Sequence, residues 1–206
     1  RGFTAILWTN TMANMPPWGA KDCRIGNNPL VMAVPRSNGQ HMVLDGAMSQ
    51  FSYGKIEECR LQGKRLPVPG GYDEHDQLTD IPGDIEKTWR VLPIGFWKGS
   101  SISILLDAMA AQLSAGNAVC DIAHNCPDEI ALSQVFIVMK PELLGEVNEE
   151  TPAVERVIDD LHQAEPVRAG SKVRYPGEQT YVRRVANQQA GSIEVVDAVW
   201  AQILAM

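Results

Sequence analysis

The chain has 206 residues, of which 45% are hydrophobic and 21% charged, values that suit a globular domain with a sizeable core. A formal net charge of -7 without a basic stripe argues against nucleic acid as a partner. The apolar runs are strand-sized, far short of the roughly 20 residues of a membrane span, so no membrane partner is expected. The four cysteines form no C-x-x-C pair, and with the acidic balance they favour free thiols and a cytoplasmic location.

The first part of the chain carries strand signals. Residues 3–8 form an apolar strand candidate, and residues 30–34 and 42–45 form two more on either side of the turn signal Ser37-Asn38-Gly39. A hairpin over residues 30–45 is therefore expected. Because residues 3–8 read as a buried strand with nothing before them to pair with, we expect the natural N-terminal segment to be absent from this sequence.

The middle of the chain begins with a turn-rich region. Residues 63–83 hold several prolines and glycines and are expected to form a long loop. After Gly99-Ser100-Ser101, a helix is expected over residues 102–115, with Gly116 at its C-cap. Its apolar positions recur at helical spacing: Ile102, Leu105, Leu106, Met109 and Leu113.

The last part mixes both kinds of element. Residues 134–139 are a further strand, ended by Pro141, and Thr151-Pro152 predicts a helix start. Val154, Val157, Ile158 and Leu161 mark one apolar face of that helix. Further helices are expected from Pro176-Gly177 to Ala190, with Gly191 as the break, and over residues 197–204. This mixture favours an α+β fold with a largely antiparallel or mixed sheet.

Common signatures of catalysis are missing from the sequence. No G-x-G-x-x-G follows a strand, so the usual dinucleotide fingerprint is absent, and there is no G-x-x-x-x-G-K-[ST] or G-x-S-x-G motif. Cys120, His124 and Cys126 are too few and too widely spaced for a zinc site, so no metal is expected. His41, His75 and His162 stand alone.

Two segments could bind a ligand. Phe96-Trp97-Lys98-Gly99-Ser100-Ser101 precedes a helix, where unpaired N–H groups, the helix dipole and the Lys98 charge would favour a phosphate. An ordinary serine-capped helix with a solvated lysine explains it equally well. The strand Met42 to Ser49 delivers the carboxylate of Asp45 next to the small residues Gly46 and Ala47, but it also fits a strand that ends in a turn.

Several motifs together resemble one enzyme family. Thr9-Asn10, Pro16-Pro17-Trp18-Gly19, Ile25 through Leu30, Val43-Leu44-Asp45 and Leu92 through Gly99 occur in the same order in the malate/L-lactate dehydrogenase-like oxidoreductases. The resemblance implies a non-Rossmann fold with a mostly antiparallel sheet flanked by helices. It also implies a homodimer that reduces small 2-keto acids or imino acids with NADH, or with NADPH. Finer features, such as Phe51-Ser52-Tyr53-Gly54 and Ile85-Glu86-Lys87, resemble one member that reduces a diketo sugar acid.

The resemblance also implies residue roles. The expected cofactor contacts are His41, Met42, Val43, Leu44, Asp45, Gly46, Ala47, Trp97, Lys98, Gly177, Glu178 and Gln179. Gly46-Ala47 and Glu178-Gln179 depart from the commoner residues of the family. The family's proton-donating histidine stands in a serine-histidine-glycine motif before the equivalent of Arg1, and none of the four histidines here stands in such a motif. Arg24 and Asn28 are candidates to hold a substrate carboxylate, and Asp45 to orient a catalytic group.

The domain organisation and the function retain alternatives. Residues 1–165 are expected to form the NAD-binding sheet domain, incomplete at its N-terminus. Residues 166–206 are expected to form a helical segment that packs with the absent N-terminal helices. The substrate could instead be malate, lactate, sulfolactate or a cyclic imino acid. A non-catalytic dinucleotide-binding or dimerising fragment is the alternative from another class.

Overall fold

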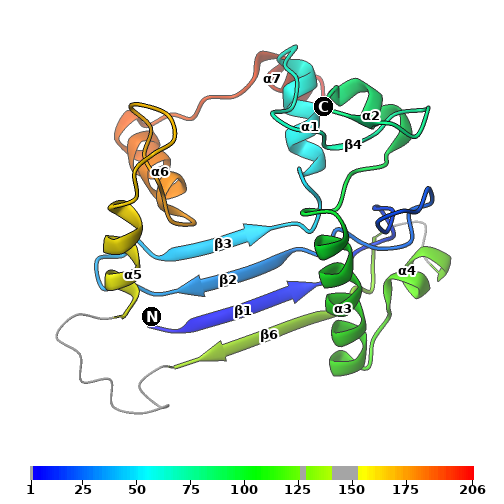
Figure 1. Ribbon diagram of the computed structural model, residues 1–206, viewed down its shortest axis with the longest axis horizontal. Helices are drawn as coiled ribbons and strands as arrows, with labels where there is room; N and C mark the ends of the chain where they lie inside the picture. Colours follow the sequence, from blue (N-terminus) through cyan, green and yellow to red (C-terminus); the bar gives the residue numbers. More distant parts are fainter. Residues whose placement is uncertain (1, 126–128, 141–152) are drawn as a thin grey trace. The chain divides into compact units, whose positions relative to one another are not determined.

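A four-stranded sheet is the main β structure of the chain. The computed structural model describes residues 2–125, 129–140 and 153–206. Strands β1 (Thr4–Thr9), β2 (Leu30–Val34), β3 (Met42–Gly46) and β6 (Gln134–Met139) lie in the order β3-β2-β1-β6. Neighbouring strands run in opposite directions (Figure 1). The expected antiparallel sheet flanked by helices, and with it the α+β class, is therefore confirmed.

The expected hairpin joins β2 to β3. Its turn reverses at Gly39, whose φ of +77° is open to glycine but costly for other residues. The Gly39 N–H donates to the Arg36 carbonyl at 3.2 Å, and the Gln40 N–H donates to the Asn38 side chain at 2.9 Å. These bonds bring residues 40–41 to the start of β3.

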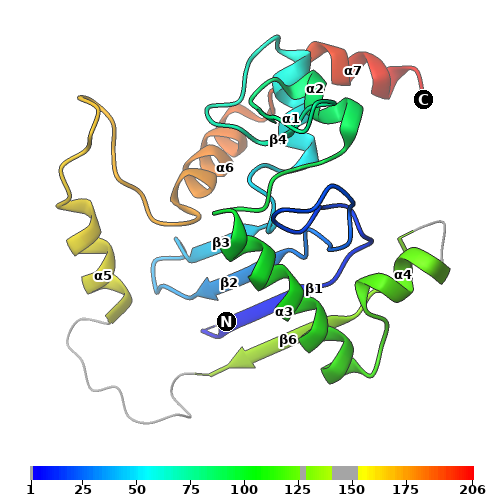
Figure 2. The same ribbon diagram turned by 45° about the vertical axis from the view of Figure 1, so that its right-hand side comes forward.

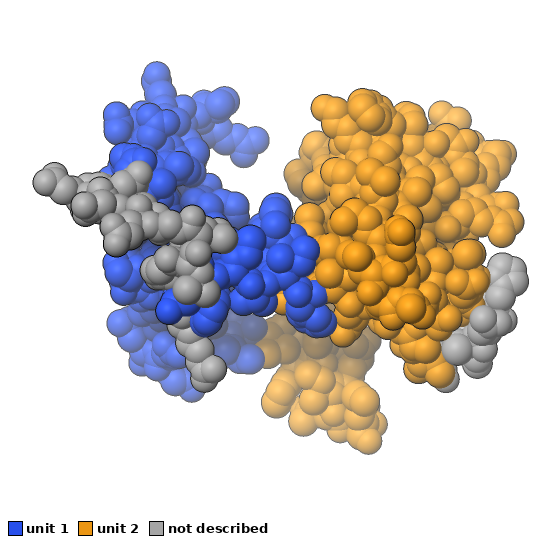
Figure 3. Space-filling model, turned by 90° about the horizontal axis from the view of Figure 1, so that it is seen from below, with its two compact units in different colours: residues 1–6, 31–45, 136–194 blue, residues 7–30, 46–135, 195–206 orange. Residues whose placement is uncertain are grey.

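The described chain forms two compact units, coloured separately in Figure 3. Unit 1 comprises residues 1–6, 31–45 and 136–194, with most of the sheet, α5 (Ala153–His162) and α6 (Glu178–Ala190). Unit 2 comprises residues 7–30, 46–135 and 195–206. Its elements are α1 (Tyr53–Leu61), β4 (Gly71–Tyr72), β5 (Leu78–Thr79), α2 (Pro82–Thr88), α3 (Trp97–Ser114), α4 (Val119–Asn125) and α7 (Asp197–Leu204). The division expected near residue 165 stays a prediction.

The region around residues 63–83 is more regular than expected. It contains the short antiparallel pair β4–β5, and α2 begins at Pro82, a residue well suited to the first helical turn. Helix α1 packs against α2 (Figure 2), with Ile56 and Ile85 almost fully buried. Helices α1, α2 and α4 were missed in the sequence because each is short and buries few apolar side chains.

Helix α3 begins earlier than expected. It starts at Trp97, with Phe96 as the capping residue, so Ser100 is not a cap. The Ser100 hydroxyl instead accepts the Trp18 N–H at 3.1 Å. The Gly99 N–H donates to the Ile94 carbonyl at 2.9 Å, and a Cβ on Gly99 would lie only 2.2 Å from that oxygen. Gly99 is therefore needed for packing within the chain.

The faces of α3 and α5 also differ from the apolar pattern. The buried side of α3 is formed by Gly99, Ser100, Ser103, Leu106 and Ala110. Ile102, Leu105, Met109 and Leu113 are exposed, so their helical spacing marks the open face of the helix. Ala115, with a φ of +50°, caps α3 in place of Gly116. Within α5, Ile158 is buried but Val157 is exposed, and the cap expected at Thr151-Pro152 lies outside the described residues.

A buried polar network fixes the end of β1 within unit 2. The Asn10 side-chain amide donates to Asp107 Oδ1 at 2.9 Å and to the Asn117 carbonyl at 2.7 Å. Its oxygen accepts the Ser133 N–H at 2.8 Å. Because Asn10 is fully buried, loss of these partners would leave polar groups unsatisfied. The network therefore ties β1 to α3 and to the start of β6.

A buried arginine organises unit 1. The Arg36 side chain is 9% exposed and makes two bonds to the Glu155 carboxylate on α5, at 2.9 and 2.5 Å. The Arg36 guanidinium also donates to the Tyr175 hydroxyl at 2.8 Å and to the Gln40 carbonyl at 3.3 Å. One side chain thus holds the hairpin, α5 and the segment before α6 together.

Replacement of Glu155 by glutamine is expected to destabilise the fold. The change leaves a buried guanidinium without its counter-charge, and we expect a loss of about 2–3 kcal/mol, below the roughly 3–5 kcal/mol of a fully buried pair because Glu155 is 24% exposed. Urea unfolding at neutral pH measures this change in the free energy of unfolding. Glu165→Gln, at an exposed site of the same unit, is the control.

The same ion pair predicts a pH dependence. The Arg36 guanidinium lowers the pKa of the Glu155 carboxyl. The ion pair therefore contributes its full stabilisation of the folded state above the ordinary glutamate pKa, about 4.3. That stabilisation disappears as the pH falls through the lowered pKa of Glu155. The stability difference between wild type and Glu155→Gln should shrink below about pH 4. A difference that stays constant down to pH 2–3, roughly two units below that ordinary value, would contradict the pairing.

Candidate functional site

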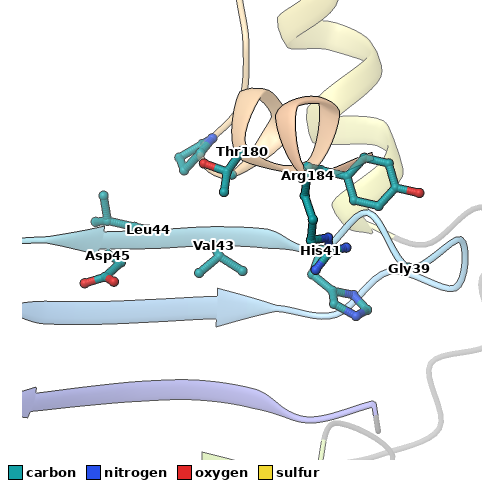
Figure 4. Close-up of a pocket in the computed structure, with 10 residues that line it drawn as sticks. Gly39, His41, Val43, Leu44, Asp45, Thr180 and Arg184 are labelled. Atoms are coloured by element: carbon teal, nitrogen blue, oxygen red, sulfur yellow. The ribbon is translucent and has the colours of Figure 1, made fainter. Parts of the chain in front are cut away.

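A pocket of about 560 Å³ lies within unit 1 (Figure 4). This size falls in the range of sites that hold small organic ligands. The residues that line it are Gly39, His41, Val43, Leu44, Asp45, Pro176, Gly177, Thr180, Tyr181 and Arg184. They come from two segments that are more than 130 residues apart in the sequence.

The wall from the C-terminal part follows the periodicity of a helix. Gly177 caps α6, and Thr180, Tyr181 and Arg184 follow it at offsets of three, four and seven residues. Positions at these offsets share one face of a helix. The opposite wall consists of β3 and the hairpin end that leads into it. One face of α6 and the β3 segment therefore form the two walls of the pocket.

The two walls meet through the backbone. The Val43 N–H donates to the Pro176 carbonyl at 2.9 Å. Gly177 has a φ of +93°, and a Cβ there would lie 3.1–3.3 Å from the Val43 backbone and the His41 carbonyl. A larger residue would be strained and would also press against β3. Glycine at position 177 is thus required for the close approach.

The first turn of α6 offers free hydrogen-bond donors. Among the described residues, the N–H groups of Gln179 and Thr180 have no partner, as is usual at a helix start. The Glu178 carboxylate accepts the Tyr175 N–H and contacts His162, each at 3.2 Å. The end of the helix therefore retains unpaired donors and the positive end of its dipole.

The β3 wall carries two polar side chains. His41 accepts the Arg36 N–H through Nδ1 at 3.1 Å, so in the neutral ring Nε2 carries the proton and can donate to a ligand. Asp45 is exposed, and no described residue forms a hydrogen bond or ion pair with its carboxylate. The pocket thus presents a donor and an acceptor on the wall formed by β3 and the hairpin end before it.

The expected cofactor residues divide between the two units. His41, Val43, Leu44, Asp45 and Gly177 line the pocket. Met42, Gly46, Ala47, Glu178 and Gln179 adjoin it in the sequence without lining it. Trp97 and Lys98 belong to unit 2, in the first turn of α3, and both are exposed. No described carboxylate lies within ion-pair distance of Lys98.

Other pocket residues were missed from the sequence. Gly39, Pro176, Thr180, Tyr181 and Arg184 were not expected to contact the cofactor. The helical spacing from Gly177 to Arg184 was a signal that could have found most of them.

Of the two substrate-binding candidates in the loop before β2, only Arg24 is open to a ligand. Asn28 is fully buried, and its amide donates to the backbone carbonyl and hydroxyl of Ser103 at 2.9 and 3.0 Å. Its oxygen accepts the Thr11 N–H at 3.1 Å. The expectation that Asn28 holds a substrate carboxylate is therefore wrong, because its hydrogen-bonding groups are used within the fold. Arg24 is exposed beside Asp22.

Among the described residues, no group of three or more histidine, cysteine or acidic side chains could hold a metal ion. Cys126 and the His124 side chain are not among those residues. No helix in the described part of the chain is long and apolar enough to cross a membrane.

Comparisons with known proteins give matches over nearly the whole chain. A 2,3-diketo-L-gulonate reductase from Salmonella typhi is 41% identical over the whole chain, and the chain spans 61% of that relative's length. A solved Δ1-piperideine-2-carboxylate reductase from Pseudomonas syringae matches 98% of the chain and 59% of its own, with 27% identity and a TM-score of 0.76. A putative malate/lactate dehydrogenase from E. coli matches 97% of the chain and 56% of its own, with 22% identity and a TM-score of 0.82. The family model described as malate/L-lactate dehydrogenase matches residues 1–204, and the chain belongs to that family.

Proposed function

We propose that the chain is the cofactor-binding part of an NADH-dependent reductase that converts 2,3-diketo-L-gulonate to 3-keto-L-gulonate. The observation that carries this proposal is the pocket between β3 and α6, which is lined by five of the residues expected to contact the cofactor. The identity to a 2,3-diketo-L-gulonate reductase supports the substrate. A homodimer belongs to the same proposal, because the family resemblance implies it.

The pocket fits a dinucleotide in its chemistry. Free amides at the start of α6 and the Arg184 guanidinium suit phosphate groups, and Asp45 suits ribose hydroxyls. Leu44, Val43 and Tyr181 add apolar surface against which a ring can lie. Glycine at position 177 keeps this surface free of a side chain. A carboxylate beside a ribose favours NADH over its 2′-phosphorylated form.

The chemistry divides between the cofactor and the protein. When bound, NADH supplies the hydride that reduces the C2 keto carbon to an alcohol. The oxygen must then gain a proton from a general acid, a contribution of typically ~10²–10⁴-fold. No histidine of this chain stands in the family's serine-histidine-glycine motif. The role that we propose for this chain is therefore cofactor binding, and no proton donor is assigned among its residues.

Other functions remain as alternatives. A cyclic imino acid, as the name of the Pseudomonas syringae relative suggests for that protein, or malate, lactate or sulfolactate would keep the same cofactor site. A non-catalytic dinucleotide-binding role would also keep it. Substrate turnover by the full-length protein separates these alternatives.

Gly177→Ala is expected to weaken NADH binding at least tenfold. The new Cβ would lie 3.1–3.3 Å from the Val43 backbone and the His41 carbonyl, and α6 must shift from that wall to relieve the contact. Gly170→Ala is the matched control, because Gly170 also has a positive φ, +76°, but nothing within 4 Å of its Cβ position. Both variants bear the backbone strain of about 1–2 kcal/mol, and only the first disturbs the pocket. Equal NADH affinity in the two variants would refute this role.

Lys98→Ala is expected to weaken NADH binding and leave folding intact. Lys98 is exposed in the first turn of α3, so its removal costs little stability. Isothermal titration calorimetry with NADH measures the affinity, and thermal unfolding checks the fold. Lys64→Ala, at an exposed site on the same unit, is the control. Unchanged affinity in Lys98→Ala would remove Lys98 from the cofactor site.

Turnover by the full-length protein tests the substrate. NADH oxidation is followed with 2,3-diketo-L-gulonate, pyruvate, oxaloacetate and a cyclic imino acid. Preferential turnover of the diketo acid is expected. Turnover of only another substrate keeps the family chemistry and replaces the substrate, and no turnover with any of them favours the non-catalytic alternative.

A further inference from the structure

The pocket has opposite charges on its two walls. Arg184 is its only arginine or lysine among the described residues, and Asp45 its only carboxylate. Neither forms an ion pair with any residue in the described ranges. Two opposite charges that line one pocket and remain unpaired are both available to a ligand.

The position of Arg184 follows from the helix. Side chains on a helix lean toward its N-terminus, and the Arg184 guanidinium lies 5.2 Å from the ring centre of Tyr181, one turn earlier. Figure 4 shows the Arg184 side chain extending from α6 toward the end of the pocket that holds His41. The stacking on Tyr181 restricts the guanidinium without using its hydrogen bonds.

The two ends of the β3 wall are well separated. His41 and Asp45 are four residues apart on an extended segment, and a rise of about 3.3 Å per residue separates them by roughly 13 Å. Figure 4 places Asp45 at the end opposite His41 and Arg184. A ligand that satisfies both ends must be extended, with an anion at one end and hydrogen-bond donors at the other.

We propose that Arg184 binds the diphosphate of the dinucleotide, while Asp45 accepts hydrogen bonds from the hydroxyls of an adjoining ribose. This inference rests on the proposed function and adds the direction in which the dinucleotide lies in the pocket. A guanidinium binds phosphate oxygens through two parallel hydrogen bonds, which a single backbone amide does not offer. A carboxylate accepts from a ribose diol and repels a phosphate. NADH has a diphosphate flanked by riboses with free hydroxyls, as this arrangement requires.

The phosphate bound by Arg184 could have two sources. The diphosphate is common to NADH and NADPH, whereas the 2′-phosphate belongs to NADPH alone. Removal of the guanidinium therefore weakens both nucleotides if it binds the diphosphate, and weakens only NADPH if it binds the 2′-phosphate.

The test compares Arg184→Gln with Arg183→Gln. Arg183 is the neighbouring exposed arginine of α6 and does not line the pocket, so the two variants have the same net charge. Affinities for NADH and NADPH are measured by isothermal titration calorimetry at fixed salt. Arg184→Gln should weaken both nucleotides by about 10–100-fold, the range of a lost hydrogen bond to a charged group. Arg183→Gln should stay within about twofold of wild type, because an exposed charge outside the pocket is screened.

Each other outcome has a definite meaning. Loss of NADPH affinity alone would assign Arg184 to the 2′-phosphate and overturn the proposal. Equal affinities in the two variants would overturn the proposal as well. In that case, nucleotide binding by the wild type would still support the proposed function. A wild-type chain that binds neither nucleotide would overturn the proposed function and this inference together. Asp45→Asn, which removes only the charge, should weaken NADH several-fold, and an unchanged affinity would remove Asp45 from the site.

Discussion

The close approach of Gly177 to strand β3 is the constraint on which the candidate site depends. It places the start of α6 against the backbone of Val43 and allows one face of the helix to form a wall. The requirement is steric, because the position has a positive φ and a Cβ there would lie only 3.1–3.3 Å from backbone atoms of His41 and Val43. A single glycine thus allows two segments that are distant in the sequence to meet, and this junction brings the first turn of α6 beside β3.

The hydrogen bonds of the buried Arg36 side chain hold the two chain segments that lead into this junction. Gln40 and Tyr175, both bonded to Arg36, directly precede His41 and Pro176 at the pocket. The anchored residues are thus the immediate chain neighbours of the residues that face a ligand. A pocket held in this way is formed before the ligand binds, which lowers the ordering cost of binding. The bidentate bond to Glu155 adds α5 to the same anchor.

The sequence predicted the sheet well and the pocket in part. The strands at 30–34 and 134–139 have the expected bounds, because alternating turn signals and apolar runs delimit them. The start of α3 was wrong, since Gly99 and Ser100 read as a cap but are used in packing against Ile94 and Trp18. Arg184 was missed because an exposed arginine on a polar helix is ordinarily solvated, and its helical spacing from Gly177 indicates a site only once the helix is placed beside β3. The expectation that Asn28 holds a substrate carboxylate was wrong, because a loop sequence does not show which of its side chains are buried.

The central claim is that NADH binds between β3 and α6, and amide chemical shifts test it most directly. The chain, at 22.6 kDa, is labelled with ¹⁵N and titrated with NADH. Saturable shifts are predicted at the amides of Val43, Leu44, Gly177, Gln179 and Thr180. Saturable shifts that leave these amides unchanged, or no saturable shift at all, would contradict the assignment of this pocket to the cofactor.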